Sequence, residues 1–409
     1  MAMVAVRKGL VSWLVVLLAA SVVFNYIDRA AIGLAAPLLK DELALSATAF
    51  GIAVSAFFWI YAPVQLFVGW LCDRFCVYRL MAAGVSLWAL STMLVGFVNG
   101  LAMLVALRLL LGLGESVAFP GSSKIIASEV PPERRGSANS VVAAAIAIGP
   151  AVGTLAGGLI MDAAGWRAMF FVFGLATLLW LVPWWLVSRP FRVHGPQAAR
   201  EAPISLRRLL RLPALWAMSI GHLVSNYGFY FLIAWLPLYL VKVRGYSIVD
   251  MTMLTAFGFA VQAVAALLWG WASDQMVRRG VSEGQLRKAL MALGHFALAV
   301  ALLGLFASRS TVGLAGWLVI AGVGLGAITT NLYAIAQMFA GPRAAGTWIG
   351  FQNALGNLSG IIGPIVTGLL IDHLGGYGLA FVVAAAVTGF GALWWWLAIP
   401  KVELITLDH

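Results

Sequence analysis

The sequence predicts an all-α membrane protein with twelve transmembrane helices in two pseudo-symmetric six-helix halves. Of its 409 residues, 62% are hydrophobic and only 10% are charged, whereas soluble domains are about half apolar and a quarter charged. The apolar residues form about twelve blocks of roughly 20 residues or more, and each block is long enough to cross a bilayer as a helix. Several short motifs also occur twice in the same order. A soluble domain is therefore excluded.

Loop signals separate the predicted helices. In the first half they place helices at approximately 11–39, 47–71, 78–98, 101–129, 136–161 and 167–189, and in the second at 213–241, 248–273, 287–308, 312–340, 346–371 and 377–399. Arg7 and Lys8 precede the first apolar run, as in a signal peptide, but that run continues to Leu39 without a cleavage site of small residues. We therefore expect a retained first helix.

The basic residues predict the orientation. An even number of helices puts both termini on one side, and most of the 26 Lys and Arg residues fall in the loops of that side. The opposite loops hold only Lys40, Arg167, Lys242, Arg244 and Arg309. Positively charged loops stay in the cytoplasm, so we expect cytoplasmic termini in a cell (inner or plasma) membrane. A basic cytoplasmic linker at 190–212 would join halves 1–189 and 213–409; its charge could also bind acidic lipid.

An internal repeat supports two related halves. Asn25-Tyr26 recurs as Asn226-Tyr227, and Gly69-x-x-x-Asp73 recurs as Gly270-x-x-x-Asp274, both at an offset of 201 residues. Later in each half, Gly149-Pro150 matches Gly363-Pro364. Membrane transporters are commonly built from such repeats, with the substrate held near the midplane where the repeats meet.

The loop after the second predicted helix carries the first family resemblance. Its sequence, Gly69-Trp-Leu-Cys-Asp73-Arg74-Phe-Cys-Val-Tyr-Arg79, resembles the signature loop of the major facilitator superfamily. Cys76 stands where that signature usually has glycine, and Tyr78 where it has a base. The resemblance implies the major facilitator fold and a cytoplasmic gate, whose predicted residues are Asp73, Arg74, Arg79 and, in the second copy, Asp274. Each loop alone could be a simple charged turn.

A second set of motifs resembles a narrower family. It comprises Asn25-Tyr-Ile-Asp28-Arg29, Arg108-x6-Glu115-x3-Phe119-Pro120 with Lys124, and Asn226-Tyr227 through Trp235-x-Pro237-x-Tyr239. This set is similar to the anion:cation symporter family, which includes bacterial sugar-acid/proton symporters, sialin and the vesicular glutamate transporters. The resemblance runs over nearly the whole chain.

Independently of any family, four ionisable residues lie deep in predicted helices: Asp28, Arg29, Arg108 and Glu115. Charges at that depth are costly and normally face a cavity or the bundle interior. Arg108 lies seven residues before Glu115, on the same helix face and ~10 Å nearer the outside, and Asp28 falls at an intermediate depth. These residues could instead form two structural salt bridges, but buried ion pairs stabilise a fold poorly.

The resemblance implies a division of roles among these residues. In the family, the acids on helices 1 and 4 carry protons and the helix 1 arginine meets the substrate carboxylate, which places proton coupling on Asp28 and Glu115 and anion binding on Arg29. Arg108 would organise the surroundings of Glu115. A guanidinium grips a carboxylate in a bidentate manner and keeps its charge, so an anionic substrate would compete with the acids for arginine.

Further polar residues complete the predicted substrate site. Three lie in the first half and four in the second: Tyr26, Tyr61, Gln65, Thr330, Tyr333, Asn353 and Asn357. Such side chains also commonly form hydrogen bonds between membrane helices. His222 lies one turn before Asn226 and could reach the same cavity.

Together these features predict proton-coupled symport of a small organic anion, a sugar acid or another carboxylate, by alternating access. The alternative is a proton-coupled antiporter that exports an amphipathic or drug-like compound, because Gly149-Pro150-x2-Gly153-x3-Gly157 resembles a signature of such antiporters, although it also permits close helix packing. We expect no enzymatic activity, no nucleic-acid partner, and no cofactor apart from protons. We also expect no metal, with Cys72 and Cys76 inert, and a monomer in the lipid bilayer.

Overall fold

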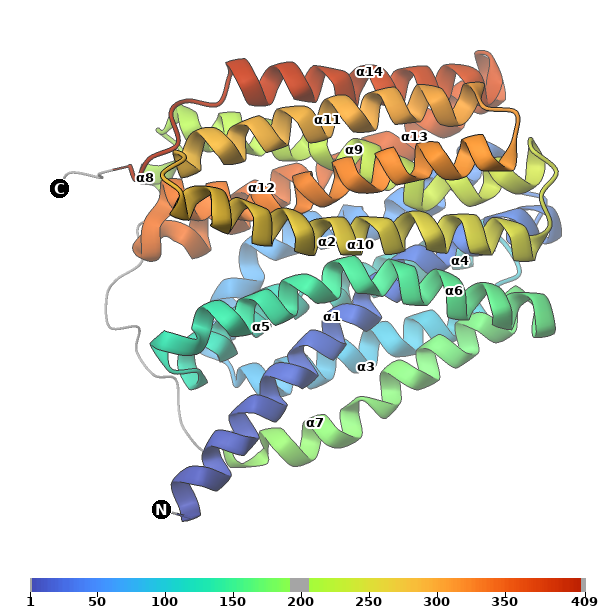
Figure 1. The fold of residues 1–409 in the computed structure, drawn as a ribbon. Helices are drawn as coiled ribbons and strands as arrows, with labels where there is room; N and C mark the ends of the chain where they lie inside the picture. Colours follow the sequence, from blue (N-terminus) through green and yellow to red (C-terminus); the bar gives the residue numbers. More distant parts are fainter. Residues whose placement is uncertain (1, 192–205, 406–409) are drawn as a thin grey trace. The chain divides into compact units, whose positions relative to one another are not determined.

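The computed structural model describes residues 2–191 and 206–405, and within these ranges it is almost entirely helical (Figure 1). The helices of the first part are α1 (Ala2–Glu42), α2 (Ala47–Arg74), α3 (Val77–Val95), α4 (Leu101–Glu115), α5 (Ala118–Glu129), α6 (Pro132–Leu179), α7 (Leu181–Ser188) and the short η1 (Arg189–Phe191). Those of the second part are α8 (Leu206–Leu209), α9 (Pro213–Lys242), α10 (Ile248–Arg278), α11 (Glu283–Ala307), α12 (Thr311–Gly356), α13 (Leu358–His373) and α14 (Gly376–Leu397).

Two very long helices, α6 and α12, each run from one membrane crossing into the next. The apolar stretch Ala144–Phe191 has 48 residues, about 72 Å at 1.5 Å per residue, which exceeds the ~30 Å of a hydrocarbon core. Gly165 interrupts α6 with φ 83°, and the chain reverses direction there (Figure 1). Gly341 interrupts α12 in the same way with φ 60°. Positive φ favours glycine. The described chain has eleven apolar stretches, which agree with the twelve predicted crossings because Ala144–Phe191 is long enough for two and is interrupted at Gly165.

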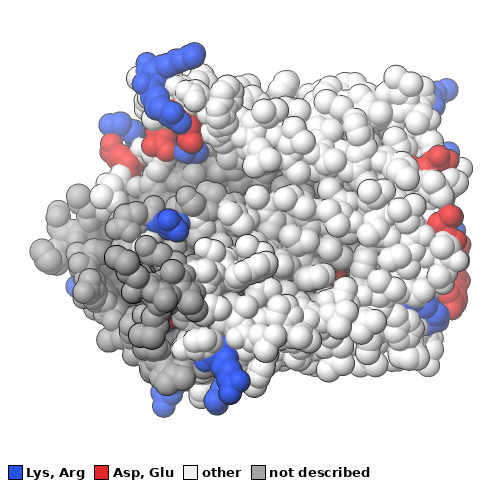
Figure 2. Space-filling model, turned by 60° about the horizontal axis from the view of Figure 1, so that its bottom comes forward, with Lys and Arg blue, Asp and Glu red and all other residues white. Residues whose placement is uncertain are grey.

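The surface is that of a protein surrounded by lipid. Large apolar side chains such as Phe67, Leu186 and Trp271 are about two-thirds exposed. On the face shown in Figure 2, charged side chains gather at the two ends and leave a wide uncharged region between them. An exposed apolar surface of this extent needs an apolar solvent, so the chain is a multi-pass membrane protein.

The contacts between residues define two compact units. The first contains residues 1–198 together with 233–256, and the second contains residues 199–232 together with 257–409. The first unit therefore includes the C-terminal part of α9 and the first residues of α10. The division into halves 1–189 and 213–409 remains a prediction, and most of the predicted linker, residues 192–205, lies outside the described residues.

Within the first unit, α6 packs closely on α1 (Figure 1). A methyl group on Gly149 would lie 2.6 Å from Cβ of Tyr26, and one on Gly153 would lie 2.9 Å from Cα of Ile27. Side chains at these positions have no room, so glycine is required for the approach. Close packing therefore accounts for the small residues of α6 that resembled an antiporter signature.

Both units break a helix beside a predicted site residue. Helix 4, predicted as continuous over 101–129, is divided into α4, which ends at Glu115, and α5. Pro120 has no N–H and cannot donate to the carbonyl of Ser116, which explains the break. In the second unit, α12 ends directly before Asn357, whose side-chain Nδ2 donates to the Asn353 carbonyl at 2.7 Å. A side chain that competes with the backbone in this way weakens a helix.

Candidate functional site

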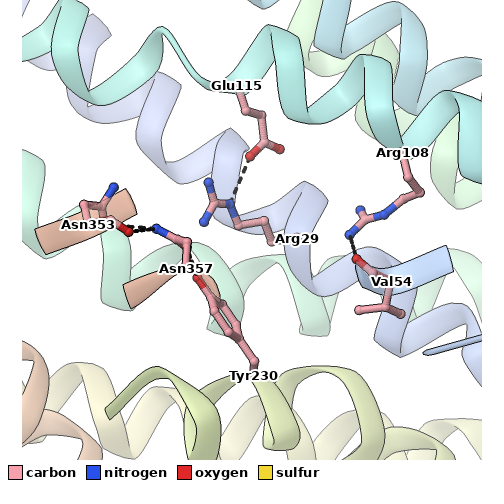
Figure 3. A network of polar contacts seen from close by, with 7 residues as sticks. All are labelled: Arg29, Val54, Arg108, Glu115, Tyr230, Asn353 and Asn357. Carbon is pink, nitrogen blue, oxygen red and sulfur yellow. Dashed lines mark hydrogen bonds and ion pairs between the residues drawn. The ribbon is translucent and has the colours of Figure 1, made fainter. Parts of the chain in front are cut away.

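A buried ion pair joins α1 and α4 in the first unit. Nε of Arg29 on α1 donates to Oε2 of Glu115 at the end of α4, at 2.9 Å (Figure 3). The side chains of Arg29 and Glu115 are 6% and 0% exposed. Two charges removed from water to this extent attract each other strongly but lose their hydration, so the net gain for stability is small. The pair is therefore better explained by function than by stability.

Three aromatic rings surround the guanidinium of Arg29. Its Cζ lies 4.5 Å from the ring centroid of Tyr61, 4.8 Å from that of Phe57 and 5.2 Å from that of Tyr26. Phe57 and Tyr61, one turn apart on α2, stack on each other at 4.9 Å. A cation is attracted to the faces of such rings. The rings thus help to hold the guanidinium in place beside Glu115.

Arg108 also lies close to Phe57. Its Cζ is 5.1 Å from the Phe57 centroid, and its Nη2 donates to the Val54 carbonyl at 3.3 Å (Figure 3). Of the four charged residues predicted to form a network, Arg29 and Glu115 are joined by a direct ion pair. Arg108 instead shares an aromatic ring with Arg29, and it is 3% exposed.

Asp28 is buried at 2% exposure on another face of α1, and neither of its carboxylate oxygens makes a hydrogen bond. Thr92 and Trp88 of α3 lie beside it, yet the Thr92 hydroxyl and the Trp88 N–H are also buried without a partner. Asn25, near Glu115, has both amide atoms unbonded. Buried polar groups are usually paired, so this cluster has the capacity to bind a proton or another polar group.

The second unit carries an uncharged cluster around Asn357 (Figure 3). Tyr230 on α9 donates to Oδ1 of Asn357 at 2.7 Å, and Nδ2 of Asn357 lies 3.1 Å from Oδ1 of Asn353. The Tyr333 hydroxyl donates to the same Asn353 oxygen at 3.1 Å. The structure therefore brings together three of the four residues predicted for this half, and it adds Tyr230.

The fourth predicted residue of this half is engaged with the backbone. The Thr330 hydroxyl lies 3.0 Å from the Ala266 carbonyl and 2.9 Å from the Gly326 carbonyl, an arrangement typical of interhelical hydrogen bonding. His222 packs with its ring edge against Tyr333, with centroids 5.7 Å apart. In the first unit, Gln65 lies on α2 one turn beyond Tyr61 and is 6% exposed.

The predicted gating residues lie at helix ends. Arg74 ends α2 and is exposed, Arg79 is exposed in the first turns of α3, and Asp274 is exposed near the end of α10. Asp73 lies in the last turn of α2, and its side chain is outside the described atoms. The gating role of these four residues remains a prediction.

Four residues of the site were missed from the sequence. Phe57, Trp88, Thr92 and Tyr230 contact or adjoin the predicted residues. The spacing of Phe57 and Tyr61 (i, i+4) placed both on one helix face and could have indicated Phe57. Trp88 and Thr92 have the same spacing but stand in an apolar helix, where nothing distinguishes them from residues that face lipid.

A two-unit helical membrane protein with acids and bases buried between its helices is typical of the secondary transporters. Proteins of this class move a substrate across the membrane and have no catalytic centre. The chain belongs to the Major Facilitator Superfamily, whose family model matches residues 18–282 and 253–406. The predicted superfamily and fold are therefore confirmed, and with them the expectation that the protein is a transporter rather than an enzyme.

Relatives of known name point in the same direction. The chain is 29% identical to a probable sulfoacetate transporter of Cupriavidus necator over 90% of its own length and 89% of the relative's. It is 29% identical to a hexuronate transporter of Bacillus subtilis (91% and 90% covered) and 27% identical to a chloroplastic ascorbate transporter of Arabidopsis thaliana (94% and 74% covered). These names agree with the resemblance to the anion:cation symporter family.

A solved structure supports the fold. A bacterial homolog of the human lysosomal transporter Spinster, in an inward-facing and unoccupied conformation, superimposes with a TM-score of 0.78 over 97% of this chain and 98% of that one. The identity is 19%, so the likeness concerns the fold alone.

Proposed function

We propose that the protein is a secondary transporter that carries a small organic anion, a sugar acid or another carboxylate, together with protons. The observation that carries the proposal is the buried ion pair between Arg29 and Glu115 inside its ring of aromatic side chains. The guanidinium is the group best suited to bind a carboxylate, and in this structure a carboxylate of the protein occupies it.

Coupling follows from the charges of this pair. A substrate carboxylate that replaced an ionised Glu115 on Arg29 would leave a buried negative charge without a partner, which costs several kcal/mol. A proton on Glu115 removes that charge, so protonation of Glu115 and binding of the anion favour each other. In a low-dielectric interior, a carboxyl that has lost its basic partner binds a proton more readily.

Asp28 is the second proposed proton site. Its carboxylate is buried next to two hydrogen-bonding groups of α3 that have no other partner. A protonated Asp28 could donate to the Thr92 hydroxyl, whereas an ionised Asp28 could accept from both Thr92 and Trp88. The surroundings thus offer partners to either form, as a site that is loaded and unloaded in each cycle requires.

The relatives support an anion as substrate. Hexuronate, sulfoacetate and ascorbate, which the names of the related transporters contain, are all small organic anions. Arg29 would bind the acidic group of such a substrate. The amide and phenol groups of Tyr230, Tyr333, Asn353 and Asn357 are suited to the hydroxyl groups of a sugar acid, because they both donate and accept hydrogen bonds.

The proposal also includes the oligomeric state, the membrane, the orientation of the termini and the coupling partner. We propose a monomer in the plasma membrane with both termini in the cytoplasm, and protons rather than a bound cofactor as the coupling partner. The positive loops on the side of the termini support this orientation.

Uptake into proteoliposomes tests the proposal. Purified protein would be reconstituted, and accumulation of labelled glucuronate, sulfoacetate and ascorbate would be followed under an outside-acid pH gradient. We expect accumulation of at least one of these anions above the outside concentration, and its loss when a protonophore dissipates the gradient. Uptake that ignores the gradient would contradict proton coupling. Proton entry that drives the labelled compound out of preloaded vesicles would establish the antiporter alternative.

A further inference from the structure

A second buried polar group lies in the second unit, apart from the cluster around Asn357. It links three helices through His295 on α11, Ser225 on α9 and Trp395 on α14, and all three residues are at most 3% exposed. Nε2 of His295 lies 2.9 Å from the Ser225 hydroxyl, and Nδ1 lies 2.7 Å from the Met291 carbonyl. Nε1 of Trp395 donates to the Ser225 hydroxyl at 3.3 Å.

The number of available protons gives these hydrogen bonds a direction. The Met291 carbonyl can only accept, so Nδ1 of His295 carries a proton. In the neutral imidazole, Nε2 then has a lone pair and needs a donor. The Ser225 hydroxyl is that donor, and it accepts from Trp395 in turn. The Gly221 carbonyl, 2.7 Å from the same hydroxyl, competes for the single hydroxyl proton, but it also accepts the Ser225 backbone N–H within the helix, whereas Nε2 of the neutral ring has no other donor. The chain of donors therefore runs from Trp395 through Ser225 and His295 to Met291.

Glycine contacts fix the imidazole ring in this position. A methyl group on Gly391 of α14 would lie 2.5 Å from Cδ2 of His295 and 2.8 Å from Cγ1 of Val224. A methyl group on Gly221 of α9 would lie 3.0 Å from the Trp395 ring. The three helices approach so closely that the ring cannot turn without moving them, so the Ser225–His295 bond sets the position of α9 relative to α11 and α14.

The next residues of α9 belong to the proposed substrate site. Nδ2 of Asn226 donates to the Gly356 carbonyl at 3.2 Å, directly before Asn357, and Tyr230 donates to Asn357 itself. Asn226 and Tyr230 are four residues apart and share one helix face. We propose that His295 is a positioning residue for transport: through Ser225 it holds the Asn226–Tyr230 turn of α9 where that turn can fix Asn357. This inference rests on the proposed function.

Two conservative variants separate this role from simple packing. The amide of glutamine can occupy the place of Nε2, so His295→Gln keeps an acceptor for Ser225 and loses the bond to Met291. The amide of asparagine can occupy the place of Nδ1, so His295→Asn keeps the bond to Met291 and loses the one to Ser225. We expect His295→Gln to retain the KM for labelled glucuronate within about twofold, and His295→Asn to raise it about tenfold, because an unmade buried hydrogen bond has an effect of this order.

The same variants have a readout that needs no substrate. Hydrogen exchange in detergent should become faster over residues 222–232 in His295→Asn and in Ser225→Ala, and remain near wild type in His295→Gln. The double variant Ser225→Ala/His295→Asn should exchange no faster than Ser225→Ala alone, because the Ser225–His295 bond is already absent there. Equal effects of His295→Gln and His295→Asn on KM and on exchange would overturn the proposal. Absence of any transport by the wild type would refute the proposed function instead, while the exchange result would still test the Ser225–His295 bond.

Discussion

Asp41, in the last turn of α1, forms an ion pair with Lys242, the last residue of α9. The two residues are 201 positions apart, which is the offset of the sequence repeat, so they occupy equivalent positions in the two halves. Gly33 and Ala234 are a second such pair: a methyl group on Gly33 would lie 3.0 Å from Cα of Ala234. Both contacts lie within the first unit, which contains α1 and the C-terminal part of α9, so the two helices cross there.

This crossing predicts a latch at the ends of α1 and α9 that lie opposite the termini. The pair is exposed at 37% for Lys242 and 62% for Asp41, so it contributes less than about 1 kcal/mol. We expect Asp41→Lys to increase labelling of a single cysteine at position 50, beside Trp235, by about two- to fivefold. The measurement is maleimide labelling in a background without Cys72 and Cys76.

The charge swap is the control for the latch. Asp41→Lys combined with Lys242→Asp restores opposite charges in reversed order and should return labelling to the wild-type level. If the double variant were labelled as readily as Asp41→Lys alone, the ion pair would have no part in closing this crossing.

Neutral amides in place of the buried acids should separate binding from coupling. Glu115→Gln resembles the protonated acid and lacks the negative charge that occupies Arg29. Exchange of external labelled anion for anion loaded inside the vesicles should therefore persist. Accumulation under a pH gradient should fall at least about tenfold, because the amide cannot release a proton. Asp28→Asn should lose accumulation for the same reason. Wild-type accumulation in both variants would refute the assignment of the proton sites.

The role of Arg29 predicts an effect on binding that exceeds the effect on folding. Lysine keeps the charge but cannot form a bidentate bond with a carboxylate or present a planar guanidinium to the surrounding rings. Arg29→Lys should therefore weaken binding of labelled glucuronate about tenfold or more, measured on purified protein, with a smaller change in thermal stability.

Arg167 provides a matched control for this change. It binds Glu42 at 2.8 Å on the exposed side of the first unit, so Arg167→Lys makes the same chemical change away from the site. Its affinity for glucuronate should equal that of the wild type. Equal losses in the two variants would show that the effect of Arg29→Lys is structural.

The charged residues of the site could be predicted from sequence, but their pairing could not. Asp28, Arg29, Arg108 and Glu115 stand out because charges inside membrane helices are rare. The adjacent residues Asp28 and Arg29 point about 100° apart on α1, so they face different neighbours. The partner of Arg29 is Glu115, 86 residues away, and the packing of α4 on α2 and of α5 on α1 brings the two together.

The roles of aromatic and small residues in the site could not be predicted from the sequence. Phe57 contacts the guanidinium groups of both Arg29 and Arg108; its spacing from Tyr61 indicates a shared helix face but not these two contacts. Similarly, the glycines of α6 resembled a transport signature, whereas their contacts with α1 show close packing. Residue type indicates the chemistry of an ionisable group, but for apolar residues only the neighbouring helices decide the role.

Gly112 holds the two helices that carry the site in place. A methyl group there would lie 2.2 Å from the Phe57 carbonyl oxygen and 3.2 Å from its carbonyl carbon, so Gly112→Ala must separate α2 from α4. We expect a loss of about 1–3 kcal/mol in stability, seen as a lower Tm in detergent, and weaker glucuronate binding, because Phe57 moves with α2. The control is Gly316→Ala in α12, where nothing lies within 4 Å; alanine there should be neutral or stabilise the helix by up to about 1 kcal/mol. Equal Tm values for the two variants would mean that the contact between Gly112 and Phe57 does not set the spacing of α2 and α4.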